Sequence, residues 1–157
     1  MRILFVSVGK AHEAYVRTGI EDFSKRIQKY FPADWLMIAP PKNAASLSEK
    51  DLKKAEAVSI ENALQKDDFF ILLDEKGKLF SSVQLAQFIQ QRANESCKRI
   101  VFVIGGAFGT DESIYKKANL VWSLSPLVFP HMLVRLILAE QVYRACTIIK
   151  NEKYHHL

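Results

Sequence analysis

Mostly apolar runs of six to eight residues alternate with helical patterns along the whole chain, and this alternation constrains the fold most. The runs are "RILFVSV", "DWLMIA", "DFFILLD", "RIVFVIGG" and "NLVWSL". Apolar residues at consecutive positions are typical of strands in a parallel sheet that helices cover on both faces. The sequence therefore predicts an α/β fold with five strands and five helices.

The segments between these runs have helical spacing. Four apolar residues in the first segment lie four, three and four positions apart and form one stripe: Val16, Ile20, Phe23 and Ile27. Helices are predicted over residues 12–30, 46–65, 81–94, 111–118 and 132–150. From the residues alone, the expected arrangement is an open, flavodoxin-like sheet with helices on both faces.

Two of the predicted helices begin with the pattern of a capping box. In Ser46-x-x-Glu49 and Ser81-x-x-Gln84, a hydroxyl precedes an acidic or amide side chain by three residues. The segment "EKGK", residues 75–78, is predicted as the turn that closes the third strand.

Length and composition indicate a single domain over residues 1–157. Apolar residues make up 49% of the chain and charged residues 25%, which is typical of globular proteins. Cys97 and Cys146 have no metal-ligand spacing around them, so we expect no metal site and no disulfide framework. The apolar N-terminal run is too short to span a bilayer and lacks a cleavage site. We expect a cytoplasmic protein with no membrane partner.

The positive charge is concentrated in the second part of the chain. Residues 1–97 carry 14 Lys and Arg against 13 Asp and Glu, whereas residues 98–157 carry 8 against 4. This bias favours an anionic partner such as RNA. Charge alone, however, fits better with a basic protein that has no nucleic-acid partner.

Three turns follow strands at the edge of the sheet where ligands bind in α/β proteins. They are residues 73–78, the glycine turn (residues 105–110) and the proline loop (residues 124–131). The glycine spacing is G-G-x-x-G, which differs from the G-x-G-x-x-G of nicotinamide dehydrogenases, and no P-loop lysine follows. A close approach of the backbone to a ligand and a merely tight strand-to-helix turn both remain open.

Several charged and aromatic residues at the start of the last helix, along it and in the tail can have either a structural or a functional role. Glu140 and Arg144 have the spacing of an ion pair within a helix, but buried charges on an apolar helix also mark interfaces and sites. His131 is predicted to contact an anionic ligand or to cap the last helix. In the tail, Tyr154 and His155 suit a base that is flipped out of its stack, unless this end is disordered.

Taken together, "FVIGGAFG", "SLSPLVFPHMLVRLILAEQVYRA" and "YHH" at the end resemble one family over the whole chain. It is the small SPOUT-class methyltransferases that methylate N3 of a pseudouridine in large-subunit (23S) ribosomal RNA. The resemblance implies a mostly parallel sheet of five to six strands with a C-terminal trefoil knot. It also implies S-adenosylmethionine as the cofactor and the assembled ribosome as the substrate. Residues 40–66 match only loosely.

The family's site residues carry over to matching positions of this sequence. The resemblance assigns cofactor contacts to Leu73, Gly105, Gly106, Leu124, Ser125, Pro126, Leu127, Val128 and Phe129. Pro126 and Pro130 would hold the proline loop rigid, because each ring fixes φ and removes a hydrogen-bond donor.

The resemblance further implies a homodimer in which the subunits share the active site. Tyr154 would position the target base and His155 would assist proton removal from N3. Arg144 joins them as a catalytic candidate, and His131 and Arg135 are candidates for RNA binding. Two alternatives remain: a SPOUT enzyme acting on another RNA such as transfer RNA, and a non-enzymatic flavodoxin-like module.

Overall fold

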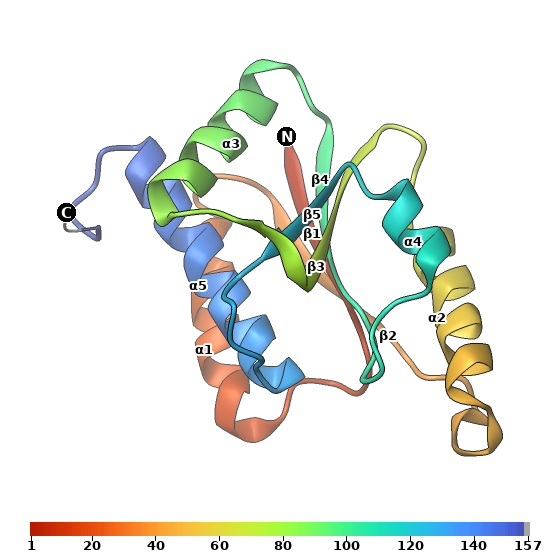
Figure 1. The fold of residues 1–157 in the computed structure, drawn as a ribbon. Helices are drawn as coiled ribbons and strands as arrows, with labels where there is room; N and C mark the ends of the chain where they lie inside the picture. The colour runs from red at the N-terminus through yellow and green to blue at the C-terminus, as the bar shows by residue number, and fades with distance from the viewer. Residues whose placement is uncertain (156–157) are drawn as a thin grey trace.

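The computed structural model describes residues 1–155 and has a five-stranded, fully parallel sheet in the order β2-β1-β4-β3-β5 (Figure 1). The strands are β1 Arg2–Val8, β2 Ala33–Ile38, β3 Asp68–Leu79, β4 Arg99–Ile104 and β5 Leu120–Ser123. The helices are α1 Ala14–Ile27, α2 Glu49–Ala63, α3 Ser82–Asn94, α4 Glu112–Lys117 and α5 His131–Ile149, with a 3₁₀ turn η1 at Ala44–Ser46. The predicted α/β fold is confirmed, whereas the trefoil knot stays a prediction.

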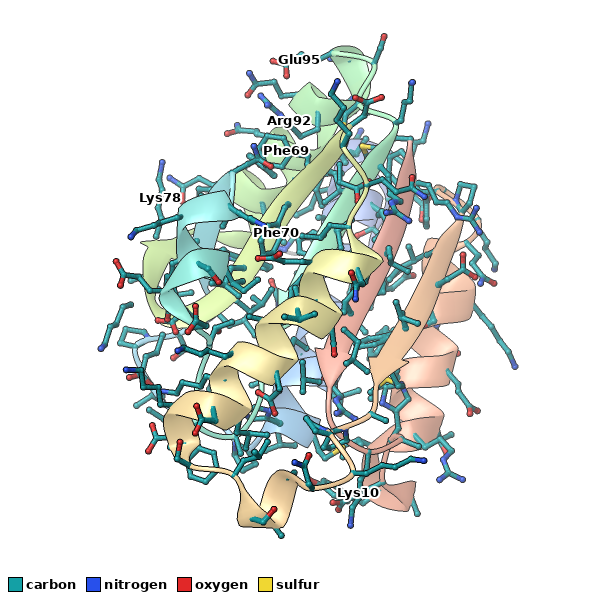
Figure 2. All side chains as sticks on the ribbon, turned by 90° about the vertical axis from the view of Figure 1, so that its right-hand side faces the viewer. Lys10, Phe69, Phe70, Lys78, Arg92 and Glu95 are labelled. Atoms are coloured by element: carbon teal, nitrogen blue, oxygen red, sulfur yellow. The ribbon has the colours of Figure 1, made fainter. Side chains whose placement is uncertain are left out.

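Helices cover both faces of the sheet because successive strand residues point to opposite sides. On β1, Ile3 and Phe5 face a core shared with α1, α3 and α5. Val6 and Val8 face a second core shared with α2 and α4. Figure 2 looks onto this second face, with α2 lying in front of the sheet. The connections after β3, β4 and β5 thus alternate between the two faces, which leaves room for a cleft at the carboxyl ends of these strands.

The predicted capping box of α3 is confirmed and that of α2 is wrong. Ser81 Oγ accepts from the Gln84 amide at 3.2 Å, and Gln84 Oε1 accepts from the Ser81 amide at 2.8 Å. Helix α2 instead begins after Ser48, whose hydroxyl accepts from the Asp51 amide at 3.1 Å. Ser46 ends η1, because a second Ser-x-x-acidic pattern lies two residues further on and provides the cap.

The segment "EKGK" is not a turn, because β3 continues through it to Leu79. The pairing of β3 with β5 shifts register here, so that Trp122 pairs with both Leu73 and Lys78. The extra residues form an irregularity in the strand at the edge of the cleft. Gly77 allows this arrangement, since a Cβ at that position would lie 2.6 Å from the backbone carbonyl carbon of Trp122.

Replacing Gly77 with alanine is therefore expected to destabilise the protein by about 1–3 kcal/mol, because the backbones of β3 and β5 must separate to admit a methyl group. Urea denaturation of the wild type and Gly77→Ala measures this difference. Lys76→Ala, at an exposed neighbouring position, is the control and should change stability by less than about 0.5 kcal/mol. Equal stabilities of Gly77→Ala and Lys76→Ala would contradict the close approach of the two strands.

Candidate functional site

A cleft of about 690 Å³ lies at the carboxyl ends of β3, β4 and β5. Its walls come from the end of β3, the glycine turn, the proline loop and the first turn of α5. Nine residues that the sequence assigned to the site line it: Leu73, Gly105, Gly106, Leu124, Ser125, Leu127, Val128, Phe129 and His131. Pro126 does not line it, although both its neighbours do. The volume is that of a typical small-molecule site.

The glycine turn forms one wall of the cleft and needs its glycines. Gly109 has a φ of +84°, a conformation that side chains disfavour. Its amide donates to the Gly106 carbonyl at 3.0 Å, which closes the turn. A Cβ at Gly106 would lie 2.6 Å from Oε1 of Glu56 on α2. The glycines therefore present backbone, rather than side chains, to the cleft along this wall.

Two serine side chains hydrogen-bond to the backbone of the proline loop, and two aliphatic side chains of the loop are exposed. Ser125 Oγ accepts from the Leu127 amide at 3.0 Å, and Ser123 Oγ donates to the Ser125 carbonyl at 2.9 Å. Leu127 is 68% exposed and Val128 is 76% exposed. Adjacent exposed aliphatic side chains on a fixed loop form a surface suited to the apolar part of a ligand.

Several residues that line the cleft were missed in the sequence. Tyr115 on α4 donates its hydroxyl to Asp74, whose other oxygen accepts from the Lys76 amide at 2.9 Å. Burial first, and then the Asp74 carboxylate, raise the pKa of Tyr115. Asp74 thus ties β3 to α4. Lys53 on α2 and Phe108 in the glycine turn also line the cleft, and no motif marks either residue.

His131 begins α5 and lines the cleft, where it is half-buried. Burial, and then the nearby Arg135 guanidinium, lower the pKa of His131. The imidazole is therefore neutral at pH 7 and offers a hydrogen bond rather than a positive charge. Its predicted contact with RNA stays a prediction.

Arg135, one turn further along α5, lies inside the protein and is 1% exposed. Its Nε donates to Ser7 Oγ and its Nη1 to the Lys10 carbonyl, both at 2.9 Å. These bonds tie the start of α5 to the end of β1. The predicted contact of Arg135 with RNA stays a prediction, and it would require the side chain to leave this position. His12 is half-buried, and the centre of its ring lies 4.9 Å from the centre of the Trp35 ring, with the two rings nearly perpendicular.

The remaining predicted residues form a cluster at the other end of α5. Arg144 Nε donates to Glu140 Oε1 at 2.9 Å, which confirms the intrahelical pair, and the Arg144 guanidinium lies 4.7 Å from the centre of the Tyr154 ring. The Tyr154 hydroxyl also donates to Glu140 Oε1, at 3.1 Å. Burial, and then Glu140, raise the pKa of Tyr154. Both ring nitrogens of His155 are buried and have no hydrogen-bond partner among residues 1–155.

The cluster around Tyr154 and the cleft are far apart within one subunit. Helix α5 has 19 residues, so its ends are about 27 Å apart at 1.5 Å per residue. The proline loop leads into one end and the C-terminal tail leaves the other (Figure 1). Tyr154, His155 and Arg144 do not line the cleft. One copy of the chain therefore does not bring the predicted cofactor contacts and the predicted tail residues together.

Residues 1–155 contain neither a helix suited to crossing a membrane nor a cluster of metal ligands. No helix there is both long and apolar enough to cross a bilayer. No group of three or more His, Cys, Asp or Glu in that part of the chain is arranged to hold a metal ion.

Comparisons with known proteins cover the whole chain. Residues 1–155 match the family described as "Predicted SPOUT methyltransferase". A protein from Cytophaga hutchinsonii named "Ribosomal RNA large subunit methyltransferase H" is 44% identical over 156 residues, which cover 99% of this chain and 100% of that one. A protein of the same name from Parabacteroides distasonis is 41% identical and covers 99% of each chain.

Among solved structures, a probable methyltransferase from Bordetella pertussis Tohama I is similar, with a TM-score of 0.56 and 13% identity. The similarity covers 92% of this chain and 96% of that chain. At this identity the similarity shows the fold alone.

Proposed function

Because this chain belongs to the SPOUT methyltransferase family, we propose that it uses S-adenosylmethionine to methylate N3 of a pseudouridine in large-subunit ribosomal RNA. The observation that carries the proposal is the match, over the full length of both chains, to relatives named for ribosomal RNA methylation. An RNA substrate also agrees with the excess of basic residues after residue 97. A ribosomal RNA substrate would also place the protein in the cytoplasm.

The cleft suits S-adenosylmethionine in size and in chemistry. Its volume is within the range of sites for ligands of this size. The exposed side chains of Leu127 and Val128 offer apolar surface for the adenine, and the glycine turn offers backbone groups for polar atoms. When bound, the cofactor supplies a methyl group on a positively charged sulfur. The chain has to position the accepting nitrogen in line with that methyl group.

The tail supplies side chains suited to the accepting base. The Tyr154 ring contacts the Tyr143 ring, whose centre is 4.7 Å from its own, and the Arg144 guanidinium, and it is suited to stacking against a uracil ring. The His155 ring nitrogens have no hydrogen-bond partner among residues 1–155, and the unprotonated one would take up the proton that N3 must lose. Arg144 acts through Tyr154, whose ring it holds.

A homodimer would bring the two parts of the site together. Since about 27 Å of helix separates them in one subunit, the tail that reaches a cleft has to come from another copy of the chain. Helix α5 packs against α1 and α3, and Leu133 and Ile137 on it are only half-buried. A two-fold axis that pairs two α5 helices in opposite directions would cover these residues and place each tail near the partner's cleft.

The alternative of a SPOUT enzyme acting on transfer RNA has the same cleft and differs only in substrate. The names of the relatives favour ribosomal RNA. The non-enzymatic alternative is excluded, because the chain belongs to a methyltransferase family.

Calorimetric titration of S-adenosylmethionine into the purified protein tests the cofactor assignment. Saturable binding is expected for S-adenosylmethionine and none for NADH or FMN, which are the controls. Binding of NADH or FMN would contradict the proposal. So would the absence of S-adenosylmethionine binding both to the free protein and in the presence of large ribosomal subunits.

A further inference from the structure

Helix α2 carries a buried carboxylate that has no role in the methyl transfer proposed above. Glu56 is 7% exposed, on the face of α2 that packs against α4 and β1. It forms no side-chain hydrogen bond and no ion pair with any residue of the described chain, and burial alone raises its pKa. The Glu56 carboxylate keeps slight contact with solvent, but a largely buried carboxylate without a protein donor still destabilises the folded state.

The carboxylate lies directly against the glycine turn. Its oxygens occupy the space that a side chain at position 106 would fill, with Oε1 2.6 Å from where a Cβ would stand. Gly106 itself lines the cleft, whereas Glu56 lies behind it. Only one residue of backbone therefore separates the carboxylate from the space that a ligand would enter.

The same turn holds backbone donors that lack acceptors. The amides of Ala107 and Phe108 donate to no protein group among residues 1–155, while the neighbouring Gly109 amide bonds to Gly106. An acceptor without donors thus lies against a turn with unused donors. Glycines at positions 105, 106 and 109 make that turn easy to reshape.

We propose that Glu56 is a positioning residue of the methyl-transfer site, whose carboxylate receives backbone N–H groups of the glycine turn when the cofactor enters the cleft. The inference rests on the proposed use of S-adenosylmethionine. The bond between a carboxylate and an amide forms in the bound state and is missing in the free protein. Part of the binding free energy therefore comes from relieving an unpaired charge, and the turn is fixed in its ligand-binding form.

This role predicts opposite effects of Glu56→Gln on stability and on binding. In the free protein the folded-state pKa is raised, so stability is lost as the pH rises above the ordinary pKa of a glutamate. Glu56→Gln should then melt about 2–4 °C higher than the wild type at pH 7.5, with no difference near pH 4. At pH 7.5 the same variant should bind S-adenosylmethionine more weakly.

The experiment measures melting temperature and S-adenosylmethionine affinity between pH 4 and 7.5 for the wild type, Glu56→Gln and Glu56→Met. Methionine accepts no comparable hydrogen bond, so Glu56→Met should raise the dissociation constant about tenfold and Glu56→Gln less. Glu61→Gln, a change at a half-buried position on the same helix that removes an ion pair with Lys117, is the control and should bind as the wild type does.

Other titratable or charged groups lie on the elements that pack around Glu56 or line the cleft, so the informative quantity is the difference between wild-type and variant profiles. These groups are Lys53 on α2, Asp111, Glu112 and Tyr115 at α4, Asp74 on β3 and His131 across the cleft. The dissociation constant of Glu56→Gln, divided by that of the wild type, should increase as the pH rises.

The outcomes separate this inference from the proposed function. If Glu56→Gln and Glu56→Met both bind S-adenosylmethionine with the dissociation constant and pH dependence of the wild type, Glu56 only fills space and the inference is wrong. It is equally wrong if Glu56→Gln and Glu56→Met lower the melting temperature of the free protein at pH 7.5. If the wild type itself shows no affinity, the proposed function fails first.

Discussion

Deletion of residues 154–157 should abolish methylation of ribosomal RNA while leaving the fold and the affinity for S-adenosylmethionine nearly unchanged. The deletion removes Tyr154 and His155, which lie at the opposite end of α5 from the cleft. Positioning of the base and removal of its proton each contribute large factors to such reactions, so the rate should fall by about a thousandfold or more. Residues 156 and 157 lie outside the described part of the chain.

Single-turnover methylation of ribosomes, calorimetry and thermal melting of the truncated protein measure these three properties. Lys153→Ala, at the exposed position before the deletion, is the matched control and should retain most of the activity. A truncated protein that methylates ribosomes at the wild-type rate would show that the tail is not catalytic. A large loss of cofactor affinity would show that the tail belongs to the cleft itself.

A heterodimer of two inactive variants should recover about half of the wild-type activity, because one of its two shared sites is intact. The first variant, Leu127→Asp with Val128→Asp, places charges on the apolar surface of the cleft and retains its tail. The second variant lacks residues 154–157 and retains its cleft. In the heterodimer, the intact cleft of one subunit meets the intact tail of the other.

Co-expression with two different affinity tags and sequential purification isolates the heterodimer for assay on ribosomes. The homodimer of each variant is the control and should be inactive. If each subunit uses its own tail, the heterodimer has no complete site and stays inactive. That result, obtained with a protein that is dimeric in solution, would contradict the shared site.

The fold class could be predicted from the sequence because its signals are local. Continuous apolar runs mark the strands of a sheet with two covered faces, and Ser81 with Gln84 marks the start of α3. The extension of β3 through "EKGK" could not, since lysine and glycine are typical of turns and only the pairing with Trp122 makes them a strand. The start of α2 was ambiguous between two serines two residues apart.

The candidate site was only partly predictable, because a site is assembled from distant segments. The glycine turn and the proline loop, which line the cleft, could be recognised in the sequence by their composition and by their position after strands. Glu56 and Lys53 lie on a charged helix in a segment without a motif, and only packing reveals that one is buried and the other lines the cleft. For Arg135 the sequence gives an arginine on a helix, but its burial depends on contacts with Ser7 and Lys10. The predicted knot would be an exception to the general rule against threaded chains, so only the resemblance suggested it.

Transfer of a labelled methyl group from S-adenosylmethionine to ribosomes that lack this modification tests the central claim most directly. The purified protein should place one methyl group on each large subunit, at N3 of a pseudouridine, and should leave free transfer RNA unlabelled. Label in transfer RNA, or no label in large-subunit RNA at saturating cofactor, would contradict the account.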